Sequence, residues 1–186
     1  MINGIFILDK EGGMTSQTAV RRVQRLLGAD KAGHTGTLDP MATGVLPILL
    51  GRAIKASEYL LTGNKHYTAT LLLGLSTDTE DVTGAPLATS DSIPDEEAVM
   101  SALAAFRGEI MQTPPMYSAL KVGGRKLCDI ARAGGVVERE ARPVTVFSLG
   151  AKRLSEREYS LDVVCSKGTY IRTLCADIGK ALGCHG

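Results

Sequence analysis

Residues 33–44 form the stretch of this chain that most limits how it can fold. They read Gly-His-Thr-Gly-Thr-Leu-Asp-Pro-Met-Ala-Thr-Gly. Three glycines, a proline and hydroxyl side chains around one aspartate suit neither a regular helix nor a regular strand. Pro40 clamps its own φ and restricts the backbone of Asp39 before it. The stretch therefore predicts an ordered loop that holds one carboxylate in a fixed position and leads into the apolar run 45–50.

Asp39 in such a loop is a candidate nucleophile, because covalent catalysis needs a reactive group that is accurately placed. Thr35 and Thr37 offer hydroxyl donors nearby, and His34 offers a flat polar ring. An aspartate that bonds only its own turn would give the same pattern, so the pattern alone leaves both interpretations open. The chain lacks the G-x-x-x-x-G-K-[ST], G-x-S-x-G, H-E-x-x-H and G-x-G-x-x-G motifs. Their absence disfavours nucleotide hydrolysis, serine esterase chemistry and dinucleotide redox chemistry.

Hydrophobic periodicity predicts helices and strands interspersed along the rest of the chain, without a clean β-α-β alternation. We expect strands at 4–9, 65–73, 142–152 and 158–166, and helices at 15–27, 52–61, 95–106, 125–132 and 171–182. Residues 76–92 are polar and predict a loop. The fold class that follows is mixed α/β (α+β), with a mixed, mainly antiparallel sheet flanked by helices. With 44% hydrophobic residues, the 186-residue chain can form the core of one domain.

The charges are unevenly distributed, although the net charge is only +1. Residues 1–75 carry eight basic and five acidic side chains, and residues 110–186 carry twelve and seven. Residues 76–109 form an acidic insert with one basic and eight acidic side chains. Such asymmetry allows a basic face on a neutral protein, although solvated surface throughout is the simpler interpretation.

Neither a membrane location nor a zinc site is indicated by the sequence. No apolar run approaches the roughly 20 residues that cross a bilayer, and no secretory signal is recognisable, so we expect a cytoplasmic protein. The four cysteines have no zinc-ligand spacing, which favours reduced thiols.

The loop and four further groups of residues resemble the TruB-type tRNA pseudouridine synthases. Residues 33–47 are very similar to the signature loop of that family. The other matches fall in the family's order and are Leu8-Asp9-Lys10 with Gly13-Met14-Thr15-Ser16, Lys65 with Tyr67, Pro114-Pro115-Met116-Tyr117-Ser118-Ala119-Leu120-Lys121, and Ser166-Lys167-Gly168-Thr169-Tyr170-Ile171-Arg172. The resemblance implies the pseudouridine synthase catalytic fold. It also implies an isomerase (an intramolecular transferase) that converts uridine 55 in the T loop of tRNA to pseudouridine.

Two features depart from the family's pattern. Glu11 stands where the family usually has a proline, which should loosen a turn without touching the chemistry. The chain also stops after Gly183-Cys184-His185-Gly186, where the family continues into an Ala/Gly-His-Leu…Leu-Arg-Arg segment and a small RNA-binding domain. We therefore expect a truncated catalytic domain, spanning residues 1–186, without that segment and that domain.

The resemblance assigns the chemistry to Asp39, Tyr67 and Arg172. Asp39 is implied as the nucleophile, and attack at the ribose C1′ and attack at C6 of the base both remain open. Arg172 resembles the arginine that pairs with this carboxylate, since a guanidinium can bind a carboxylate through two donors. Tyr67 resembles the tyrosine that stacks on the flipped base and is a candidate to take the proton from C5. The reaction needs no cofactor, metal or ATP.

The resemblance also implies how the RNA is held. His34 resembles the histidine that enters the RNA stack in place of the extruded uridine, Tyr170 would wall the pocket, and Lys10 would lie near it and balance charge. Basic side chains elsewhere are candidates for contacts with the RNA backbone. These candidates are Arg21, Arg22, Arg25, Lys121, Arg125, Lys126 and Arg132. The partner implied is the T arm of tRNA, bound by a monomer.

Two further classes of function stay open beside this one. A non-catalytic module that binds or folds tRNA would share the basic residues, and a small-molecule enzyme could use Asp39 as its nucleophile. Intact Asp39, Tyr67 and Arg172 favour the pseudouridine synthase.

Overall fold

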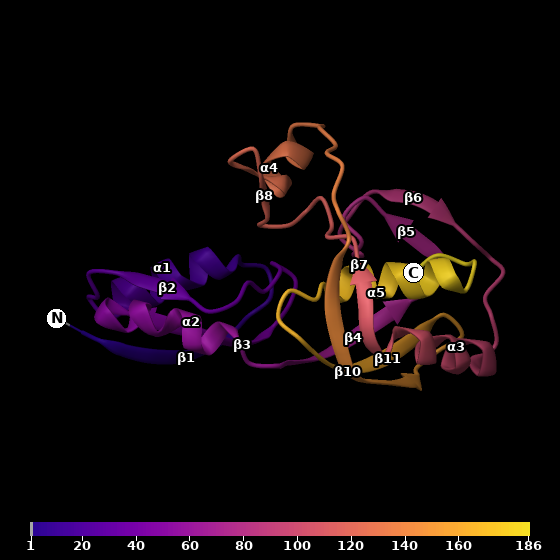
Figure 1. The fold of residues 1–186 in the computed structure, drawn as a ribbon, viewed down its shortest axis with the longest axis horizontal. Coiled ribbons are helices and arrows are strands. Elements are labelled where there is room, and N and C mark those ends of the chain that lie inside the picture. The colour runs from indigo at the N-terminus through magenta and orange to yellow at the C-terminus, as the bar shows by residue number, and fades with distance from the viewer. Residues whose placement is uncertain (1) are drawn as a thin grey trace. The chain divides into compact units, whose positions relative to one another are not determined.

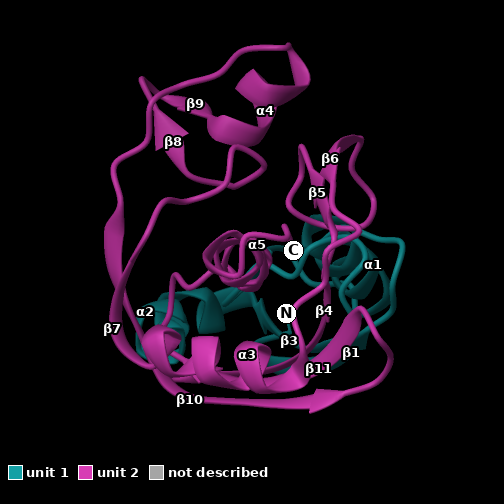
Figure 2. Cartoon of the chain, turned by 90° about the vertical axis from the view of Figure 1, so that its right-hand side faces the viewer, with its two compact units in different colours: residues 1–63 teal, residues 64–186 magenta. Residues whose placement is uncertain are grey.

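The computed structural model describes residues 2–186 and divides into two compact units. One unit ends at Gly63 and the other begins at Asn64 (Figure 2). Each has its own sheet and its own buried core.

The first unit consists of a three-stranded antiparallel sheet with one long helix packed on it (Figure 1). The sheet order is β1-β3-β2, with β1 at Gly4–Lys10, β3 at Gly44–Leu50 and β2 at Ala32–His34. Helix α1 (Ser16–Leu26) begins where Thr15 accepts a hydrogen bond from the backbone N–H of Thr18. The buried residues of α1 meet alternate residues of β3, and together they form the core: Ala19, Val20, Val23, Leu46, Ile48 and Leu50.

Two short helical segments complete this unit. A 3-10 helix, η1, covers Gly51–Ala56, and α2 continues from it over Ser57–Leu61. The helix predicted at 52–61 is therefore present, but its first part is wound more tightly than an α-helix.

The second unit is built on a four-stranded antiparallel sheet in the order β4-β11-β10-β7. The strands are β4 (Lys65–Leu72), β11 (Glu158–Cys165), β10 (Arg142–Arg153) and β7 (Gly108–Gln112). Helices α3 (Glu96–Ala102) and α5 (Ile171–Ala181) and the 3-10 helix η2 (Leu103–Phe106) contribute to the same buried core as the sheet. On β11 every second residue enters this core, namely Tyr159, Leu161, Val163 and Cys165.

A bulge in β10 changes which of its residues face the core. Val144 and Val146 are buried, and regular alternation would put Ser148 on the same face. The pairing with β11 shifts between Val146 and Ser148, so Leu149 is buried instead. One extra residue at this point therefore keeps both halves of a 12-residue strand packed on one core.

Several sequence predictions need correction at the edges of this second unit. Residues 76–92 were expected to be loop, but β5 (Leu75–Thr77) pairs with β6 (Pro86–Thr89) in a small hairpin. The helix expected at 125–132 begins two residues later, as α4 (Leu127–Arg132). Its first two residues instead form β9 (Arg125–Lys126), which pairs with β8 (Lys121–Val122). Strand β7 has no counterpart among the predicted elements, because its short Gly-Glu-Ile-Met-Gln sequence has only two apolar residues.

The predicted fold class is confirmed: helices are interspersed with sheets whose described strand pairs are antiparallel. Within residues 2–186, no helix has both the length and the apolar character needed to cross a lipid bilayer.

Candidate active site

The predicted site residues are divided between the two units. Lys10, His34 and Asp39 belong to the first unit, and Tyr67, Tyr170 and Arg172 belong to the second.

The loop that carries Asp39 is fixed on both sides of the aspartate, by the start of α1 and by the turn that precedes this helix. The Ser16 hydroxyl accepts a hydrogen bond from the N–H of Leu38 (2.9 Å) and donates one to the carbonyl of Leu38 (3.0 Å). On the other side of Asp39, the carbonyl of Pro40 accepts from the N–H of Gly13 (2.8 Å). Residues 38 and 40 are therefore both anchored, and the backbone of the aspartate between them has little freedom.

Lys10 lies buried under this same loop. Its side chain is 0% exposed, and its Nζ donates to the carbonyls of Glu11 (2.9 Å), Met14 (2.9 Å) and Pro40 (3.3 Å). Burial lowers the pKa of Lys10 below its usual value, and the negative charge of Asp39 acts in the opposite direction. The structure therefore places Lys10 at the loop of Asp39, where it ties the turn after β1 to that loop.

His34 is the last residue of β2, and its ring is held in one orientation. Its Nδ1 lies 2.6 Å from the carbonyl oxygen of Gly36. Because a carbonyl only accepts hydrogen bonds, Nδ1 carries the proton, which assigns the tautomer by its partner. The Nε2 edge is then left to act as an acceptor or to carry a second proton.

Loss of the Ser16 hydroxyl should damage both the stability of the loop and its placement of Asp39. Ser16 is only 3% exposed, and Ser16→Ala leaves the N–H and the carbonyl of the half-buried Leu38 without this partner. A polar group left unsatisfied costs up to about 1–3 kcal/mol when it is fully buried. We expect a lower melting temperature and a slower reaction at a temperature where the variant is folded. Gln17→Ala, an exposed change on the same helix, is the matched control. Equal melting temperatures and rates for the two variants would contradict this account of the loop.

In the second unit, Arg172 is held by a set of acceptors. It lies in the first turn of α5, and its guanidinium donates from Nη1 to the carbonyl of Thr79 and from Nη2 to that of Tyr117 (3.0 Å). The carboxylate of Asp81 lies 3.8 Å from Nη1, and the side chains of this ion pair are each 12% exposed. These acceptors therefore fix the direction of the guanidinium.

Tyr170 and Tyr67 are both half-buried in this unit. Gln112 accepts from the backbone N–H of Tyr170 (2.8 Å) and donates to its carbonyl (3.1 Å), so the start of α5 is tied to β7. Tyr67 lies on β4 opposite Val163 and packs against the core that also contains Leu174 of α5. The pairing of Arg172 with Asp39 stays a prediction, as do the catalytic roles of Asp39, Tyr67 and Arg172.

Asp81 is a site residue that the sequence analysis did not identify. Its Oδ1 accepts from the hydroxyls of Thr79 (2.9 Å) and Thr83 (2.5 Å) and from the N–H of Thr83 (2.9 Å). Burial alone would raise the pKa of Asp81, but the bonds from Thr83 and Thr79 and the charge of Arg172 outweigh it, and the pKa lies below its usual value. Asp81 is thus an ionised anchor for Arg172. The only signal in the sequence was the density of Thr and Asp in Ser-Thr-Asp-Thr-Glu-Asp-Val-Thr-Gly, residue types that bond their own loop.

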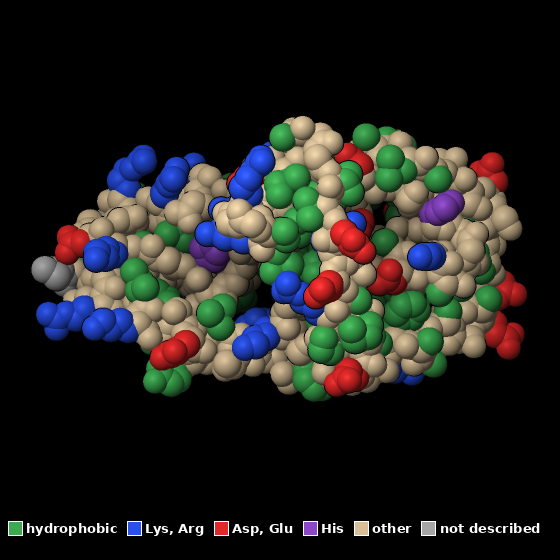
Figure 3. All heavy atoms as spheres, turned by 45° about the horizontal axis from the view of Figure 1, so that its top comes forward, with side chains coloured by type: hydrophobic (Ala, Val, Ile, Leu, Met, Phe, Trp, Pro, Cys, Tyr) green, Lys and Arg blue, Asp and Glu red, His purple; other side chains and the backbone are tan. Residues whose placement is uncertain are grey.

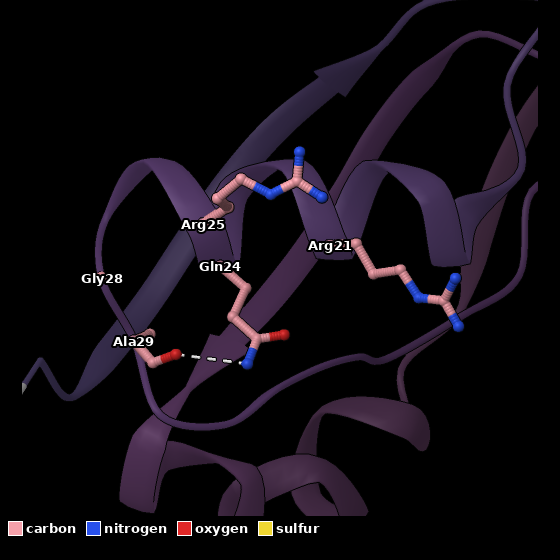
Figure 4. A pocket seen from close by; sticks show the side chains of 5 residues that line it. All are labelled: Arg21, Gln24, Arg25, Gly28 and Ala29. Carbon is pink, nitrogen blue, oxygen red and sulfur yellow. Dashed lines mark hydrogen bonds between the residues drawn. The ribbon is translucent and has the colours of Figure 1, made fainter.

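The basic side chains named as RNA-backbone candidates fall on separate surfaces. Arg21 and Arg25 line a shallow hollow of α1 with Gln24, whose amide donates to the carbonyl of Ala29 (3.2 Å) (Figure 4). Arg22 lines a different hollow, together with Asp9, Glu11 and apolar residues. Figure 3 shows Lys and Arg side chains gathered on the visible face of the first unit.

In the second unit, the β8–β9 hairpin is strongly basic. Lys121 pairs directly with Lys126, and Arg125 lies in the next pair. Like charges opposite each other destabilise a strand pair unless an anion comes between them. Arg132 at the end of α4 is engaged differently, in an exposed ion pair with Asp129 (3.7 Å). The hairpin is therefore a better candidate for phosphate contacts than Arg132. Within residues 2–186, no cluster of three or more His, Cys, Asp or Glu side chains could hold a metal ion.

Comparisons with known proteins show which family the chain belongs to. The model of the TruB family pseudouridylate synthases (N terminal domain) matches residues 24–171. A tRNA pseudouridine synthase B of Aromatoleum aromaticum is 52% identical over 186 residues, which is 100% of this chain and 60% of the relative. One of Pasteurella multocida is 51% identical over 98% of this chain and 60% of its own length. The chain therefore belongs to the TruB family of pseudouridylate synthases, as the resemblance predicted, and it spans 60% of the length of these relatives.

Solved structures give the same result for the fold. The crystal structure of a Cbf5-Nop10-Gar1 complex contains a chain with a TM-score of 0.74 and 31% identity, which covers 98% of this chain and 45% of that one. A chain in an H/ACA RNP bound to a substrate RNA containing 2′-deoxyuridine has a TM-score of 0.69 and 28% identity, over 98% of this chain and 44% of that one.

Proposed function

We propose that this chain carries the catalytic residues of a tRNA pseudouridine synthase that isomerises uridine 55 in the T loop of tRNA. The observation that carries the proposal is the anchored Asp39 loop, with Leu38 bonded to Ser16 and Pro40 bonded to Gly13, in a chain of the TruB family. The names of its relatives, tRNA pseudouridine synthase B, support tRNA as the substrate.

In the proposed reaction, the carboxylate of Asp39 attacks the target nucleoside and forms an ester-like adduct. The bond from C1′ to N1 of uracil breaks, the base turns, and a bond from C1′ to C5 forms. The adduct with Asp39 breaks, C5 loses its proton and N1 gains one, so atoms and oxidation level are conserved and no cofactor is required. Attack at C1′ and attack at C6 both fit a carboxylate.

Three side chains assist this chemistry in the proposal. Tyr67 stacks on the flipped uracil and takes the proton from C5, Tyr170 forms a wall of the pocket, and Arg172 orients the catalytic carboxylate. A base leaves its stack at a cost of a few kcal/mol, and the ring of His34 fills the gap. The bond from His34 to Gly36 supports this role, because it removes the freedom of a ring that must enter a stack in one orientation.

RNA is held by its phosphates on the basic surfaces of the two units, namely the α1 hollow of Arg21 and Arg25 and the β8–β9 hairpin. The α1 hollow and the Asp39 loop belong to the same unit, and the first residue of α1, Ser16, is bonded to Leu38 of that loop. Since a helix rises 1.5 Å per residue, Arg21 and Arg25 lie about 8 and 14 Å along the axis from Ser16, which contacts the Asp39 loop. In this proposal, the RNA chain whose target uridine lies at Asp39 continues along the surface of α1.

The α1 arginines provide a test of this RNA path. Changing Arg21 and Arg25 together to Gln should weaken binding of a T-arm hairpin and lower its salt slope by about 0.7–0.9 for each phosphate that is no longer neutralised. Arg22→Gln is the matched control, because Arg22 lies beside Asp9 and Glu11 and should change the slope less. Binding constants at three or more salt concentrations measure this. Equal slopes for wild type, the double variant and Arg22→Gln would remove α1 from the path.

The proposed target can be tested with matched RNAs. Full tRNA and a T-arm hairpin should both yield pseudouridine at position 55, and replacing only that uridine by cytidine should abolish the product. Reverse-transcriptase mapping after carbodiimide treatment identifies the modified position. Product at another uridine would change the target, and tight binding without product would identify a non-catalytic RNA-binding module.

A further inference from the structure

Glu80 has a backbone conformation that its residue type disfavours. Its φ is 60°, and among the described residues only His185 shares a positive φ without being glycine. A side chain in this region crowds its own backbone, so the conformation persists only where the surroundings enforce it. Residues other than glycine that have a positive φ tend to lie at functional sites, where the surrounding structure holds them in place.

The side chain of Glu80 is bonded to α5. The hydroxyl of Thr173 donates to its Oε2, and Thr173 is 4% exposed. Thr173 follows Arg172 directly, in the first turn of α5. The bond therefore joins the loop 77–84 to the same helical turn that presents the arginine.

The residues on both sides of Glu80 contact Arg172. The carbonyl of Thr79 accepts from its Nη1, and the carboxylate of Asp81 lies 3.8 Å from that nitrogen. Three consecutive residues thus meet one helical turn, with Glu80 bonded to Thr173 and its two neighbours directed at Arg172. Without the bond from Thr173 to Glu80, the loop would lose one of its attachments to α5, and the two acceptors would be held less firmly at the guanidinium.

Hydrogen bonds and a close contact at Gly84 hold the rest of the loop together. The hydroxyl of Thr77 accepts from the N–H of Asp81 (3.1 Å) and donates to its carbonyl (2.7 Å). Gly84 leaves no room for a Cβ, which would collide with the side chains of Thr79 and Asp78. The loop is therefore held together by its own bonds, and the bond from Thr173 to Glu80 is one of the contacts that set its position on α5.

We infer that Glu80 is a positioning residue for the reaction, holding the loop 77–84 through Thr173 so that Thr79 and Asp81 fix the direction of Arg172. The inference rests on the proposed function, since Glu80 acts only through Arg172. It adds two residues, Glu80 and Thr173, that the family resemblance did not assign. Neither touches the substrate in this proposal.

The charges around Glu80 allow this role in either protonation state. Burial raises its pKa, the bond from Thr173 and the charge of Arg172 lower it, Asp177 raises it and Arg139 lowers it, with a net shift upward. A threonine hydroxyl can donate to a carboxylate and can also accept from a carboxylic acid. Glu80→Gln should therefore preserve the attachment, whereas Glu80→Ala removes it.

The kinetic test compares Glu80→Ala, Glu80→Gln and Thr173→Val with Glu97→Ala, an exposed acidic change on α3. We expect Glu80→Ala and Thr173→Val each to lower kcat by about tenfold with RNA affinity unchanged, because small displacements of a catalytic group cost that much or more. Their double variant should be no slower than either alone, and Glu80→Gln and Glu97→Ala should stay near wild type. In an Arg172→Lys background, Glu80→Ala should add little. A full further decrease in that background would overturn the inference.

A measurement without turnover separates this inference from the proposed function. The ¹⁵N signals of the Arg172 guanidinium report how freely it rotates. Glu80→Ala should broaden or shift them, and Glu97→Ala should leave them unchanged. Unchanged Arg172 signals in Glu80→Ala would overturn the inference even if the wild type were active. Changed signals with an inactive wild type would support the positioning role and contradict the proposed function.

Discussion

Asp39→Ala and Asp39→Asn should abolish pseudouridine formation while leaving RNA affinity nearly unchanged. In the proposed reaction the carboxylate makes and breaks the bond to the nucleoside, and an alanine methyl or a neutral amide cannot replace it. In the proposed complex, affinity comes largely from phosphate contacts made by other side chains. Tritium released from RNA labelled at C5 of uridine measures turnover, and binding of the same RNA is measured in parallel.

Asp30→Ala is the control for Asp39, since Asp30 is an exposed aspartate of the same unit. It should leave turnover unchanged. An Asp39→Ala protein that turns over within about tenfold of wild type would remove Asp39 as the nucleophile, because loss of a nucleophile costs several powers of ten.

Arg172→Lys should lose most of the rate although it keeps the positive charge. In the structure, two nitrogens of the planar Arg172 guanidinium donate hydrogen bonds to the carbonyls of Thr79 and Tyr117, and the carboxylate of Asp81 lies beside them. An ammonium is a point charge on a flexible stem and cannot fix its direction through that arrangement. Arg172→Lys also leaves the carbonyls of Thr79 and Tyr117 without their guanidinium donor. The loss of a partner costs about 1–3 kcal/mol for each polar group that is buried.

The comparison for Arg172 is Arg132→Lys, a change of the same kind at an exposed arginine of α4. Single-turnover rates at saturating RNA should fall strongly for Arg172→Lys and hardly at all for Arg132→Lys. If both lysine variants reacted at the wild-type rate, the charge of residue 172 would suffice, and the geometry of the guanidinium would have no role.

The elements that the sequence predicted well are those with local signals. Helix α1 has a capping Thr15 before it, apolar residues at helical spacing within it and Gly28 after it, and it lies where expected. The loop of Asp39 was recognisable for a similar reason, because glycines and Pro40 disfavour regular structure over a short stretch. The predicted range 33–44 was too long, since β2 includes Gly33 and His34 and β3 begins at Gly44. The hydrogen bonds that hold this loop could not be predicted. They join Ser16 to Leu38, which are 22 positions apart, and no local sequence pattern indicates such a contact.

The parts that the sequence missed depend on distant partners. Strand β7 is defined by pairing with β10 across about thirty residues, and its own sequence carries little β signal. Asp81 was counted only as one charge of an acidic insert, because its partner Arg172 is 91 residues away. Glu80 and Thr173 were missed for the same reason, being 93 residues apart.

The most direct test of the whole account is a single-turnover reaction of this chain with a T-arm hairpin, at enzyme concentrations above the dissociation constant and at two salt concentrations. Nuclease digestion and chromatography of the nucleosides quantify uridine and pseudouridine. We predict one pseudouridine per hairpin with the wild type at both salt concentrations, because the RNA is bound at each, and none with Asp39→Ala. Complete binding of the hairpin with no pseudouridine at either salt concentration would contradict the account.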